Sequence, residues 1–367
     1  MSVQIISACR SAVVPRGGAF AALSLHDLGA PVLQAAMAQA GLVAAQVDEV
    51  IVSNALGGGG NPARLVALAA GLPQRIAGLS IDRQCAGGLD SLLLARQMIL
   101  SGAADVVIAG GVESYSRRPL RLVTFADGRQ PEAYDHPPFS PWPDRDPDMA
   151  QAADQLAQSE GTTREMQDSW AIDSHQKARN AAFGNGEIIP LGDVQTDSFT
   201  RNLTPALCAR AAAISGSVTA ANTSVAADAA AFCVVVSDRM ATQLGRSGPT
   251  ILGGATCGSA PESPGIAPIA AIKAALKQTN LAPNDIDIAE VMEAYAVQAI
   301  ACVQGAGLKP DRVNLGGGSL ARGHPIGVSG TINGVRLYHE LERRGCGTGM
   351  ATIAAAGGIA TALVLRA

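Results

Sequence analysis

Residues 81–92 read IDRQCAGGLDSL, a stretch that sets Cys85 between a short apolar run and an amphipathic helical pattern. The run predicts a strand that ends at Asp82, and the pattern predicts a helix after Gly88, so Cys85 lies at a strand-to-helix turn. Free N–H groups and the positive end of the helix dipole would favour a thiolate there. A cysteine beside glycines is more often a small buried residue, so this stretch alone does not assign a nucleophile.

A second stretch, residues 313–330, reads VNLGGGSLARGHPIGVSG and predicts another strand, glycine-rich turn and helix. It presents His324 within the turn. A neutral imidazole near a thiol can take its proton, so Cys85 and His324 form a minimal activated-nucleophile pair. The remaining histidines are interpreted as ordinary surface or core residues: His26, His136, His175 and His339.

Together the two stretches resemble the thiolase family, whose members make and break carbon–carbon bonds between acyl groups held as coenzyme A thioesters. The resemblance runs nearly end to end. Its matches, in chain order, are VQIISACRSAV at 3–13, NPAR at 61–64, RQCAGGL at 83–89, AGGVESYS at 109–116, TREMQDSWAIDSHQKA at 163–178, GSVTAANTS at 216–224, EAYAVQ at 293–298 and GHPIGVSG at 323–330. So many ordered matches are specific for the family.

The order of predicted elements repeats along the chain, which favours two copies of one α/β unit. PVLQAAMAQAGL followed by DEVIVSNAL corresponds to PIAAIKAALKQTNL followed by DIAEVMEAY. The resemblance implies a duplicated, layered α-β-α-β-α fold with an inserted loop domain. We expect an N-terminal half at 1–115, completed by about 216–245, a loop domain at 116–215 over the substrate tunnel, and a C-terminal half at 246–367. The two turns would then meet where the sheets adjoin.

The composition is that of a large, tightly packed protein. Its 367 residues are 48% hydrophobic, 3% aromatic and 16% charged, which suits helices packed on sheets and argues against disorder. A net charge of −4 gives no electrostatic reason to expect nucleic acid or membrane partners. Seven scattered cysteines lack metal-ligand spacing, and no secretory signal or spanning apolar run is recognisable. We therefore expect reduced thiols in a cytoplasmic protein without a metal site.

The resemblance also implies roles for particular residues. Cys85 would be the acylated nucleophile and His324 its base, and the backbone N–H groups of Cys85 and Ala356 would hold the oxyanion of the acyl-enzyme. Three residues would line the substrate tunnel: Ser224, Met149 and Tyr295. Ser224 would touch the pantetheine amide, although a serine in a polar turn can serve the turn alone. No cofactor is expected to stay bound, because the coenzyme A thioester is itself the substrate.

Two positions depart from the family pattern. Thiolases have Asn-Glu-Ala-Phe where residues 292–295 read Met-Glu-Ala-Tyr, and that asparagine fixes a water that stabilises the enolate. A thioether cannot donate a hydrogen bond, so Met292 cannot anchor the water. The family's second catalytic cysteine, which moves the alpha proton, is replaced by Ala354. Neither Cys302 nor Cys346 is an obvious substitute for it.

The predicted function is acyl transfer from acyl-CoA through a covalent acyl-enzyme on Cys85, like that of an acetyl-CoA acetyltransferase in lipid metabolism. Claisen condensation and thiolysis need alpha-proton removal, so the two departures predict that these reactions are impaired. Enolate-independent acyl transfer, thioester hydrolysis and decarboxylative condensation stay open as alternatives, because none needs that step. A non-catalytic acyl-CoA-binding scaffold is the alternative of another class. We expect a homodimer or a homotetramer, because the proline-rich part of the loop domain is unlike the usual loop that ties dimers together.

Overall fold

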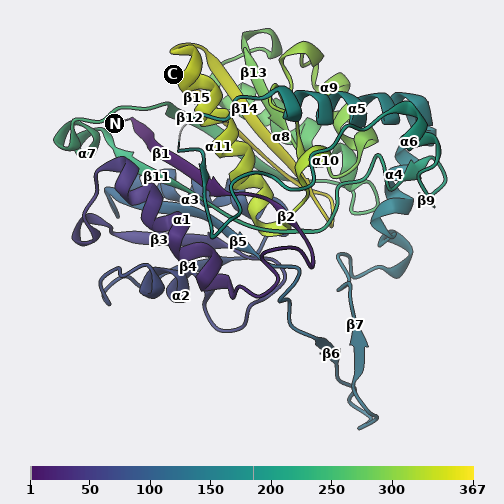
Figure 1. Ribbon diagram of the computed structural model, residues 1–367, viewed down its shortest axis with the longest axis horizontal. Coiled ribbons are helices and arrows are strands. Elements are labelled where there is room, and N and C mark those ends of the chain that lie inside the picture. Colours follow the sequence, from purple (N-terminus) through teal and green to yellow (C-terminus); the bar gives the residue numbers. More distant parts are fainter. Residues whose placement is uncertain (1, 185) are drawn as a thin grey trace.

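The computed structural model describes residues 2–184 and 186–367 and contains one long mixed sheet with helices packed around it (Figure 1). The strands follow the order β13-β14-β15-β12-β1-β11-β5-β3-β4. The first half of the sheet is made of β1 (Val3–Ser11), β3 (Glu49–Ser53), β4 (Leu79–Ile81), β5 (Val106–Glu113) and β11 (Ala227–Ser237). The second half is made of β12 (Thr250–Gly258), β13 (Ile288–Val291), β14 (Thr348–Ala355) and β15 (Ile359–Arg366). Short strands β2 (Val14–Pro15) and β8 (Ile188–Ile189) pair with β11 and β1.

The two halves of the sheet are built alike. From the centre outward, the first half runs β1-β11-β5-β3 and the second runs β12-β15-β14-β13. Strands β3 and β5 are parallel, as are β13 and β14, whereas the inner pairs are antiparallel. The halves join through one residue pair, Gln4 with Thr250. The repeated order of sequence elements therefore corresponds to a repeated arrangement of strands.

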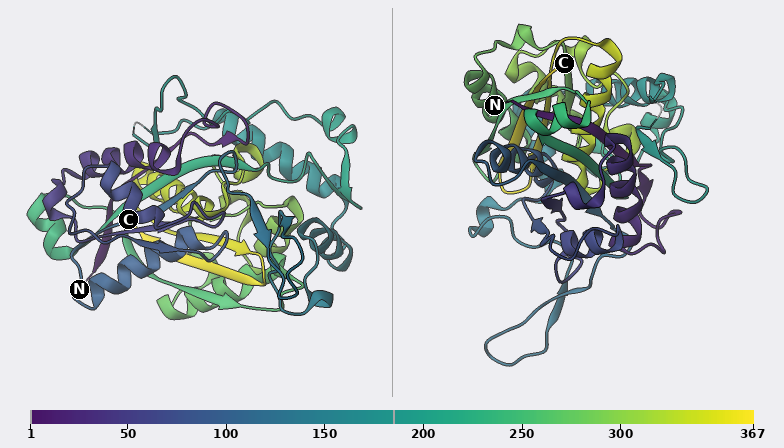
Figure 2. Two further views of the ribbon diagram at one scale, coloured as in Figure 1. Left: turned by 90° about the horizontal axis from the view of Figure 1, so that it is seen from below. Right: turned by 90° about the vertical axis from the view of Figure 1, so that its left-hand side faces the viewer.

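Helices form three layers around the two halves. Helices α3 (Gly87–Leu100) and α11 (Ile326–Arg344) share one apolar core with strands of both halves. Helices α1 (Leu25–Ala40) and α2 (Pro62–Ala69) cover the outer face of the first half, and α8 (Ala267–Thr279) and α9 (Ala296–Ala306) cover that of the second. Figures 1 and 2 show this arrangement. The layers thus run α-β-α-β-α, and the predicted fold class is confirmed.

The central helices α3 and α11 touch through glycines near their first turns. A Cβ atom on Gly88 would lie 2.5 Å from the Thr331 nitrogen, and one on Gly330 would lie 2.6 Å from the Leu89 nitrogen. Both distances are too short for a side chain, so the two backbones can approach this closely only with glycine at both positions. Because both helices begin near this contact, the turns that carry Cys85 and His324 meet at the same end of the core.

Helix α1, in the first copy of the repeated pattern, is capped at both ends. The Ser24 side chain accepts a hydrogen bond from the Asp27 nitrogen, and the Asp27 carboxylate accepts one from the Ser24 nitrogen, which together cap the start of α1. Gly41 ends the helix with a φ of 72°. The segments predicted as helix and strand in the two copies are α1 with β3, and α8 with β13.

The strand predicted before His324 is not formed. Residues 314–318 are a loop, followed by the one-turn helix α10 (Ser319–Arg322), and only Val313 makes a bridge, to Ala289. The side chain of Asn314 explains this difference. Its Oδ1 accepts from the Val291 nitrogen over 2.8 Å, and its Nδ2 donates to the Val291 oxygen over 2.9 Å. The Asn314 side chain therefore pairs with the Val291 N–H and C=O groups at the edge of β13, where the sequence pattern predicted that a strand would pair.

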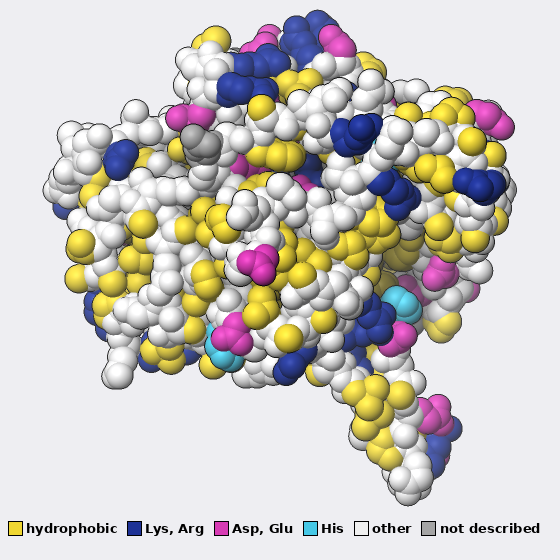
Figure 3. Space-filling model, in the orientation of Figure 1, with side chains coloured by type: hydrophobic (Ala, Val, Ile, Leu, Met, Phe, Trp, Pro, Cys, Tyr) yellow, Lys and Arg dark blue, Asp and Glu magenta, His cyan; other side chains and the backbone are white. Residues whose placement is uncertain are grey.

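The segment between the copies carries a projecting hairpin, formed by β6 (Arg121–Val123) and β7 (Glu132–Tyr134), which we call the arm (Figures 1 and 2). Figure 3 shows hydrophobic side chains on it, and Leu120 at its base is 78% exposed. The same segment holds α4 (Met149–Ser159), α5 (Arg164–Asn180) and α6 (Pro205–Ala209), followed by β9 (Ala213–Ser215) and β10 (Val218–Thr219); a short helix, α7 (Asp238–Leu244), follows β11. The predicted domain limits stay a prediction. None of the described helices is long and apolar enough to span a bilayer.

Candidate active site

The turn that carries Cys85 begins where β4 ends. The Asp82 carboxylate accepts a hydrogen bond from the Gln84 nitrogen over 2.8 Å, which turns the chain back towards the sheet. Gln84 has a φ of 50°, a left-handed conformation that residues other than glycine seldom adopt. Helix α3 begins two residues after Cys85. Such a strained backbone persists only where the surrounding structure holds it, and it is common at functional sites.

His324 lies in the turn between α10 and α11, and its hydrogen bonds define its tautomer. Its Nδ1 lies 2.7 Å from the Ser329 oxygen, and the Ser329 hydroxyl donates to the Pro325 carbonyl over 3.1 Å. Because the serine proton is used, Nδ1 must carry the hydrogen and donate it to Ser329. Nε2 therefore has a free lone pair, and it lies 3.2 Å from the Cys85 sulfur. This is the geometry of a thiol paired with a base.

Burial keeps this pair uncharged in the free protein. Burial raises the pKa of the Cys85 thiol to about 12, although the backbone N–H groups of Cys85 and Ala356 oppose that rise. Burial also lowers the pKa of His324 to about 4. The expectation that the start of α3 favours a thiolate is therefore wrong for the resting state, because loss of solvation outweighs the N–H donors. The proton would move only as the sulfur attacks a substrate.

Cys85 and His324 both line a cavity of about 270 Å³. The other residues predicted from the sequence line it as well: Ser224, Met149, Tyr295 and Ala356. They come from separate parts of the chain, since Ser224 precedes β11, Met149 begins α4, Tyr295 precedes α9 and Ala356 follows β14. Most of the remaining wall is apolar, with Phe139, Leu156, Pro264 and Ile326 among its side chains. The cavity thus suits a largely apolar chain with a reactive carbonyl near the Cys–His pair.

Two of these residues also have clear local roles. The Ser224 hydroxyl donates to the Glu293 carbonyl, and the Ser224 nitrogen donates to the Ala294 oxygen over 3.0 Å, so this serine joins the two halves at the cavity. Asp148, which precedes Met149, accepts from the Ala150 nitrogen over 2.8 Å and caps α4. The cap fixes the first turn of the helix that presents Met149 to the cavity.

The two departures from the family pattern leave no acid or base in their places. Ala354 lines the cavity at the end of β14 and has no ionisable group. Met292 is only 1% exposed and is not among the cavity-lining residues. Its sulfur lies 3.4 Å from the Ser319 hydroxyl, which donates to the Glu293 carbonyl over 2.9 Å. Cys302 is buried and donates to the Gly265 carbonyl over 3.1 Å. Cys346 is exposed, and neither cysteine lines the cavity.

Sequence reasoning missed Glu113, a fully buried carboxylate at the end of β5. It accepts four N–H donors: Asn54 Nδ2 at 2.7 Å, Ala55 at 2.9 Å, Leu56 at 3.3 Å and Gly327 at 2.9 Å. Burial raises the pKa of this carboxyl to about 7, and its backbone donors oppose the rise. Glu113 thereby ties the first turn of α11 to the loop after β3, which holds the two halves together beside the site. Its place within the AGGVESYS match was the available signal.

Two further residues of the cavity were missed, Tyr115 and His136. Tyr115 follows β5 by two residues, and His136 follows β7 at the base of the arm. His136 was interpreted as an ordinary surface residue, and that interpretation was incomplete, because its exposed side chain also forms part of the cavity wall. No local pattern could indicate this, since the tertiary fold brings the segment that follows the arm to the cavity.

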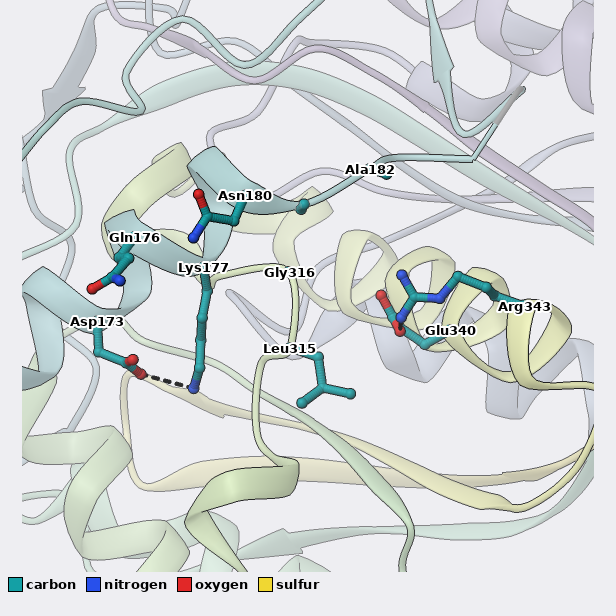
Figure 4. Close-up of a pocket in the computed structure, with 10 residues that line it drawn as sticks. Asp173, Gln176, Lys177, Asn180, Ala182, Leu315, Gly316, Glu340 and Arg343 are labelled. Carbon is teal, nitrogen blue, oxygen red and sulfur yellow. Dashed lines mark hydrogen bonds and ion pairs between the residues drawn. The ribbon is translucent and has the colours of Figure 1, made fainter.

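A separate cavity of about 390 Å³ lies between α5 and the C-terminal part of α11 (Figure 4). The two cavities share no lining residue. Its charged groups pair with one another: Lys177 with Asp173 at 2.7 Å, and Arg343 with Glu340. Figure 4 shows the first of these pairs as a dashed line. It therefore offers no unpaired catalytic group, and the chemistry is concentrated at Cys85.

Comparison with known proteins assigns this arrangement to a family. The family descriptions "Thiolase, N-terminal domain" and "Thiolase, C-terminal domain" match residues 3–239 and 248–367. The chain belongs to the thiolase family. It is 38% identical to the acetyl-CoA acetyltransferase of Cupriavidus necator over 99% of both chains. It is 35% identical to that of Allochromatium vinosum over 100% of this chain and 99% of the relative.

A solved thiolase-family structure has the same fold. The crystal structure of the Bacillus anthracis acetyl-CoA acetyltransferase superposes with a TM-score of 0.94 at 33% identity, covering 100% of this chain and 98% of that chain. The predicted family, fold class and acyltransferase class are therefore confirmed.

Proposed function

We propose that this thiolase takes acyl groups from acyl-CoA thioesters and holds them covalently on Cys85, with His324 as the base. The observation that carries the proposal is the 3.2 Å separation of the Cys85 sulfur and His324 Nε2 at the wall of the cavity. The names of the relatives, acetyl-CoA acetyltransferases, support acyl-CoA as the substrate. A non-catalytic scaffold would have no use for a thiol paired with a base in this way.

Acylation would proceed in two chemical steps, attack on the carbonyl and collapse of the intermediate. His324 Nε2 takes the thiol proton as the Cys85 sulfur attacks the thioester carbonyl, and the negative oxygen is held by the N–H groups of Cys85 and Ala356. Collapse of this intermediate breaks the bond to the coenzyme A sulfur, which leaves with the proton from the imidazolium. An acceptor nucleophile then attacks the carbonyl of the acyl-enzyme, and the Cys85 sulfur leaves as its thiol. Hydrogen-bonded Ser329 keeps Nε2 facing the sulfur throughout.

Carbon–carbon bond formation would be the weak step of this enzyme. Thiolysis and Claisen condensation also require a proton to move at the carbon alpha to the carbonyl. A positioned acid or base contributes about 10²–10⁴ in rate to such a step. Ala354 cannot supply it, and buried Met292 cannot hold the water that stabilises an enolate. We therefore propose ready acylation of Cys85 with slow acetoacetyl-CoA thiolysis.

The test is the intact mass of the protein after mixing with a panel of acyl-CoA compounds, followed by peptide mapping. A thioester adduct on the Cys85 peptide is expected, and it should be absent in a Cys85→Ser variant. Cys346→Ser is the matched control, because Cys346 is exposed and does not line the cavity. An adduct on Cys302 or Cys346 that persists in Cys85→Ser would overturn the assignment.

We also propose a homodimer assembled through the edge of the sheet at β4. Leu79 on this edge strand is 41% exposed, whereas Ser80 and Ile81 are partly buried, and the neighbouring helix α2 exposes Leu65 and Leu68. An open apolar strand edge is a ready site for pairing with another chain. Sedimentation at micromolar concentration should give a dimer, and a monomer would contradict the proposal. A tetramer would indicate that the arm joins dimers.

Finally, we propose a cytoplasmic enzyme of lipid metabolism. All seven cysteines are free thiols, as expected of a reducing compartment. Fractionation of cells that produce the protein would test this: activity in the soluble cytoplasmic fraction is expected, and activity in a membrane or secreted fraction would contradict it.

A further inference from the structure

A buried carboxylate, Asp90, links the Cys85 turn to the other half of the sheet. It lies in the first turn of α3 and is 3% exposed. Its Oδ1 accepts hydrogen bonds from the hydroxyls of Thr256 over 2.6 Å and Thr361 over 2.7 Å. These two threonines are paired residues on β12 and β15. A side chain of the first half is therefore anchored on two strands of the second.

The other oxygen of Asp90 faces the turn itself. Asp90 Oδ2 lies 2.9 Å from Nη1 of Arg83, and the contact is an ion pair rather than an aligned hydrogen bond. Arg83 stands just before the turn residues Gln84 and Cys85, and its carbonyl accepts a hydrogen bond from the Ala86 nitrogen over 3.1 Å. The ion pair thus spans the turn, from the residues before Cys85 to the helix after it.

The turn needs support because its backbone is strained. Gln84, with its φ of 50°, accepts a hydrogen bond on its carbonyl from the Gly87 nitrogen over 3.2 Å. In a trans peptide the N–H group points opposite to the C=O group, so this contact also sets the direction of the Cys85 N–H group. A left-handed residue other than glycine persists only where neighbouring contacts hold it. A rotation at Gln84 would therefore turn the Cys85 N–H group away.

The two donors of the proposed oxyanion hole come from different halves of the protein. The Cys85 N–H group belongs to the turn before α3, and the Ala356 N–H group follows β14. Both lower the pKa of the Cys85 thiol, so they converge on one sulfur. Strand β14 pairs with β15, which carries Thr361. Asp90 is therefore connected to both donors, through Arg83 to one and through Thr361 to the other.

We propose that Arg83 and Asp90 are positioning residues that hold the Cys85 N–H group beside that of Ala356, so that the oxyanion of a thioester meets both donors. The inference rests on the proposed acylation of Cys85. It separates two functions of the turn. Presentation of the sulfur to His324 needs no oxyanion donor, whereas stabilisation of the oxyanion does. Loss of the ion pair should therefore weaken the second function more than the first.

The test compares two reactions of the Cys85 sulfur. Acylation by acetyl-CoA forms an oxyanion, whereas alkylation by iodoacetamide displaces iodide and forms none. In both reactions His324 takes the thiol proton. Each rate constant is measured on the Cys85 peptide from quenched samples, so that the other cysteines do not interfere. The proteins are the natural one, Arg83→Met, Arg83→Lys and Asp90→Asn, of which the last keeps an Oδ1 acceptor for the threonines and removes the charge.

Arg96→Met is the matched control. Arg96 also lies on α3, and its guanidinium donates to the carbonyls of Ile251 over 3.1 Å and Leu252 over 3.0 Å, next to and on β12 respectively with Asp90's partner strand. It is not part of the Cys85 turn. This variant therefore loosens α3 from the same region of the second half without removing the ion pair.

Arg83→Met and Asp90→Asn should slow acylation by about tenfold, less than the roughly 10²–10³ for removal of a donor, because the N–H group is displaced and not lost. Alkylation should slow by less than about threefold, since there the N–H groups only lower the pKa of the thiol. Arg83→Lys and Arg96→Met should keep the natural ratio of the two rate constants. Equal slowing of both reactions in Arg83→Met, or the same fall of the ratio in Arg96→Met, would indicate a purely structural role and overturn the inference.

The natural protein separates this inference from the proposed function. If iodoacetamide alkylates Cys85 and acetyl-CoA does not acylate it, the proposed function fails. If both reactions occur and every variant keeps the natural ratio, only the inference on Arg83 and Asp90 fails. Asp90→Asn carries the comparison by itself if Arg83→Met does not fold.

Discussion

The cavity has two regions with opposite chemical character. One region holds Cys85, His324 and two backbone N–H groups, which are the groups that the proposed acylation requires. The other surrounds Ala354, where the family resemblance predicts the group that moves the alpha proton of a substrate. Met292, at the second position that departs from the family pattern, is buried and does not line the cavity. The first region is polar and precisely paired, whereas the second is apolar. This difference supports the proposal that acylation and alpha-proton transfer depend on separate groups, so that the second step can weaken while the first is kept.

The largest effect should follow from removing the base in the region that holds Cys85 and His324, which we call the intact region. We expect His324→Ala to slow acylation of Cys85 by about 10²–10⁴-fold, because the thiol, with its pKa raised to about 12, then has no proton acceptor. Quenched time courses of acylation measure the rate constant directly. His26→Ala is the control, since the His26 side chain is 45% exposed and does not line the cavity. A His324→Ala protein that acylates at the natural rate would show that another group accepts the proton.

The next largest effect should come from rebuilding the apolar region. We expect the double variant Met292→Asn, Ala354→Cys to gain about 10²-fold or more in acetoacetyl-CoA thiolysis, because it restores an acid/base and a donor for the enolate. The gains need not multiply, since both groups act on one intermediate. Acylation rates in the same proteins serve as the reference.

That experiment can also break the comparison. If the natural protein thiolyses acetoacetyl-CoA at an ordinary turnover of about 10 per second, the apolar region does not limit the reaction. A double variant that gains acylation and thiolysis equally would show that the two regions are not independent.

Much of the fold and of the intact region could be predicted from the sequence. The repeated order of helix and strand indicated a duplicated sheet, and glycines at Gly88 and Gly330 permit the contact that unites the two turns. Cys85 and His324 lie in glycine-containing turns that the sequence pattern indicated. What could not be predicted depends on contacts distant in sequence. The Asn314 side chain makes the hydrogen bonds at the edge of β13 that a predicted strand would have made. Burial raises the pKa of the Cys85 thiol more than the N–H groups at the start of α3 lower it. His136 reaches the cavity only because the chain returns to the body of the protein after the arm.

A smaller effect should follow from loosening the contact between the halves. Glu113→Gln would present an amide N–H group to backbone donors that now meet a carboxylate oxygen, so at least one buried hydrogen bond is lost. We expect the free energy of unfolding to fall by about 1–3 kcal/mol and acylation to slow by less than the loss of the base does. Thermal unfolding and acylation rates measure the two effects.

Glu160→Gln is the control for Glu113→Gln, because Glu160 is exposed at the end of α4. If Glu113→Gln leaves both stability and acylation unchanged, the carboxylate does not hold α11 against the loop after β3. If stability falls and acylation does not, the contact between the halves matters for folding but not for the position of His324.

The smallest expected effect is that of pH on acylation. An ordinary histidine base with a pKa near 6.5 would lose activity as pH falls through that value. Burial lowers the pKa of His324 to about 4, so its neutral, proton-accepting form persists at all higher pH values and is lost only as pH falls through about 4. The raised pKa of Cys85, about 12, likewise means that no thiolate accumulates near neutrality. Neither group of the pair changes charge between about pH 5 and about pH 9, so we expect acylation by the Glu113→Gln variant to change by less than about twofold there. In the natural protein, Glu113, whose pKa burial raises to about 7, gains a proton as pH falls through that value and should slow acylation slightly. Single-turnover acylation in buffers of constant ionic strength measures this, with circular dichroism at each pH to establish that the protein stays folded. A limb with an apparent pKa between 6 and 7 that persists in Glu113→Gln would show that the Cys85–His324 pair is better solvated than its burial implies, and the neutral resting state of the pair would then be wrong.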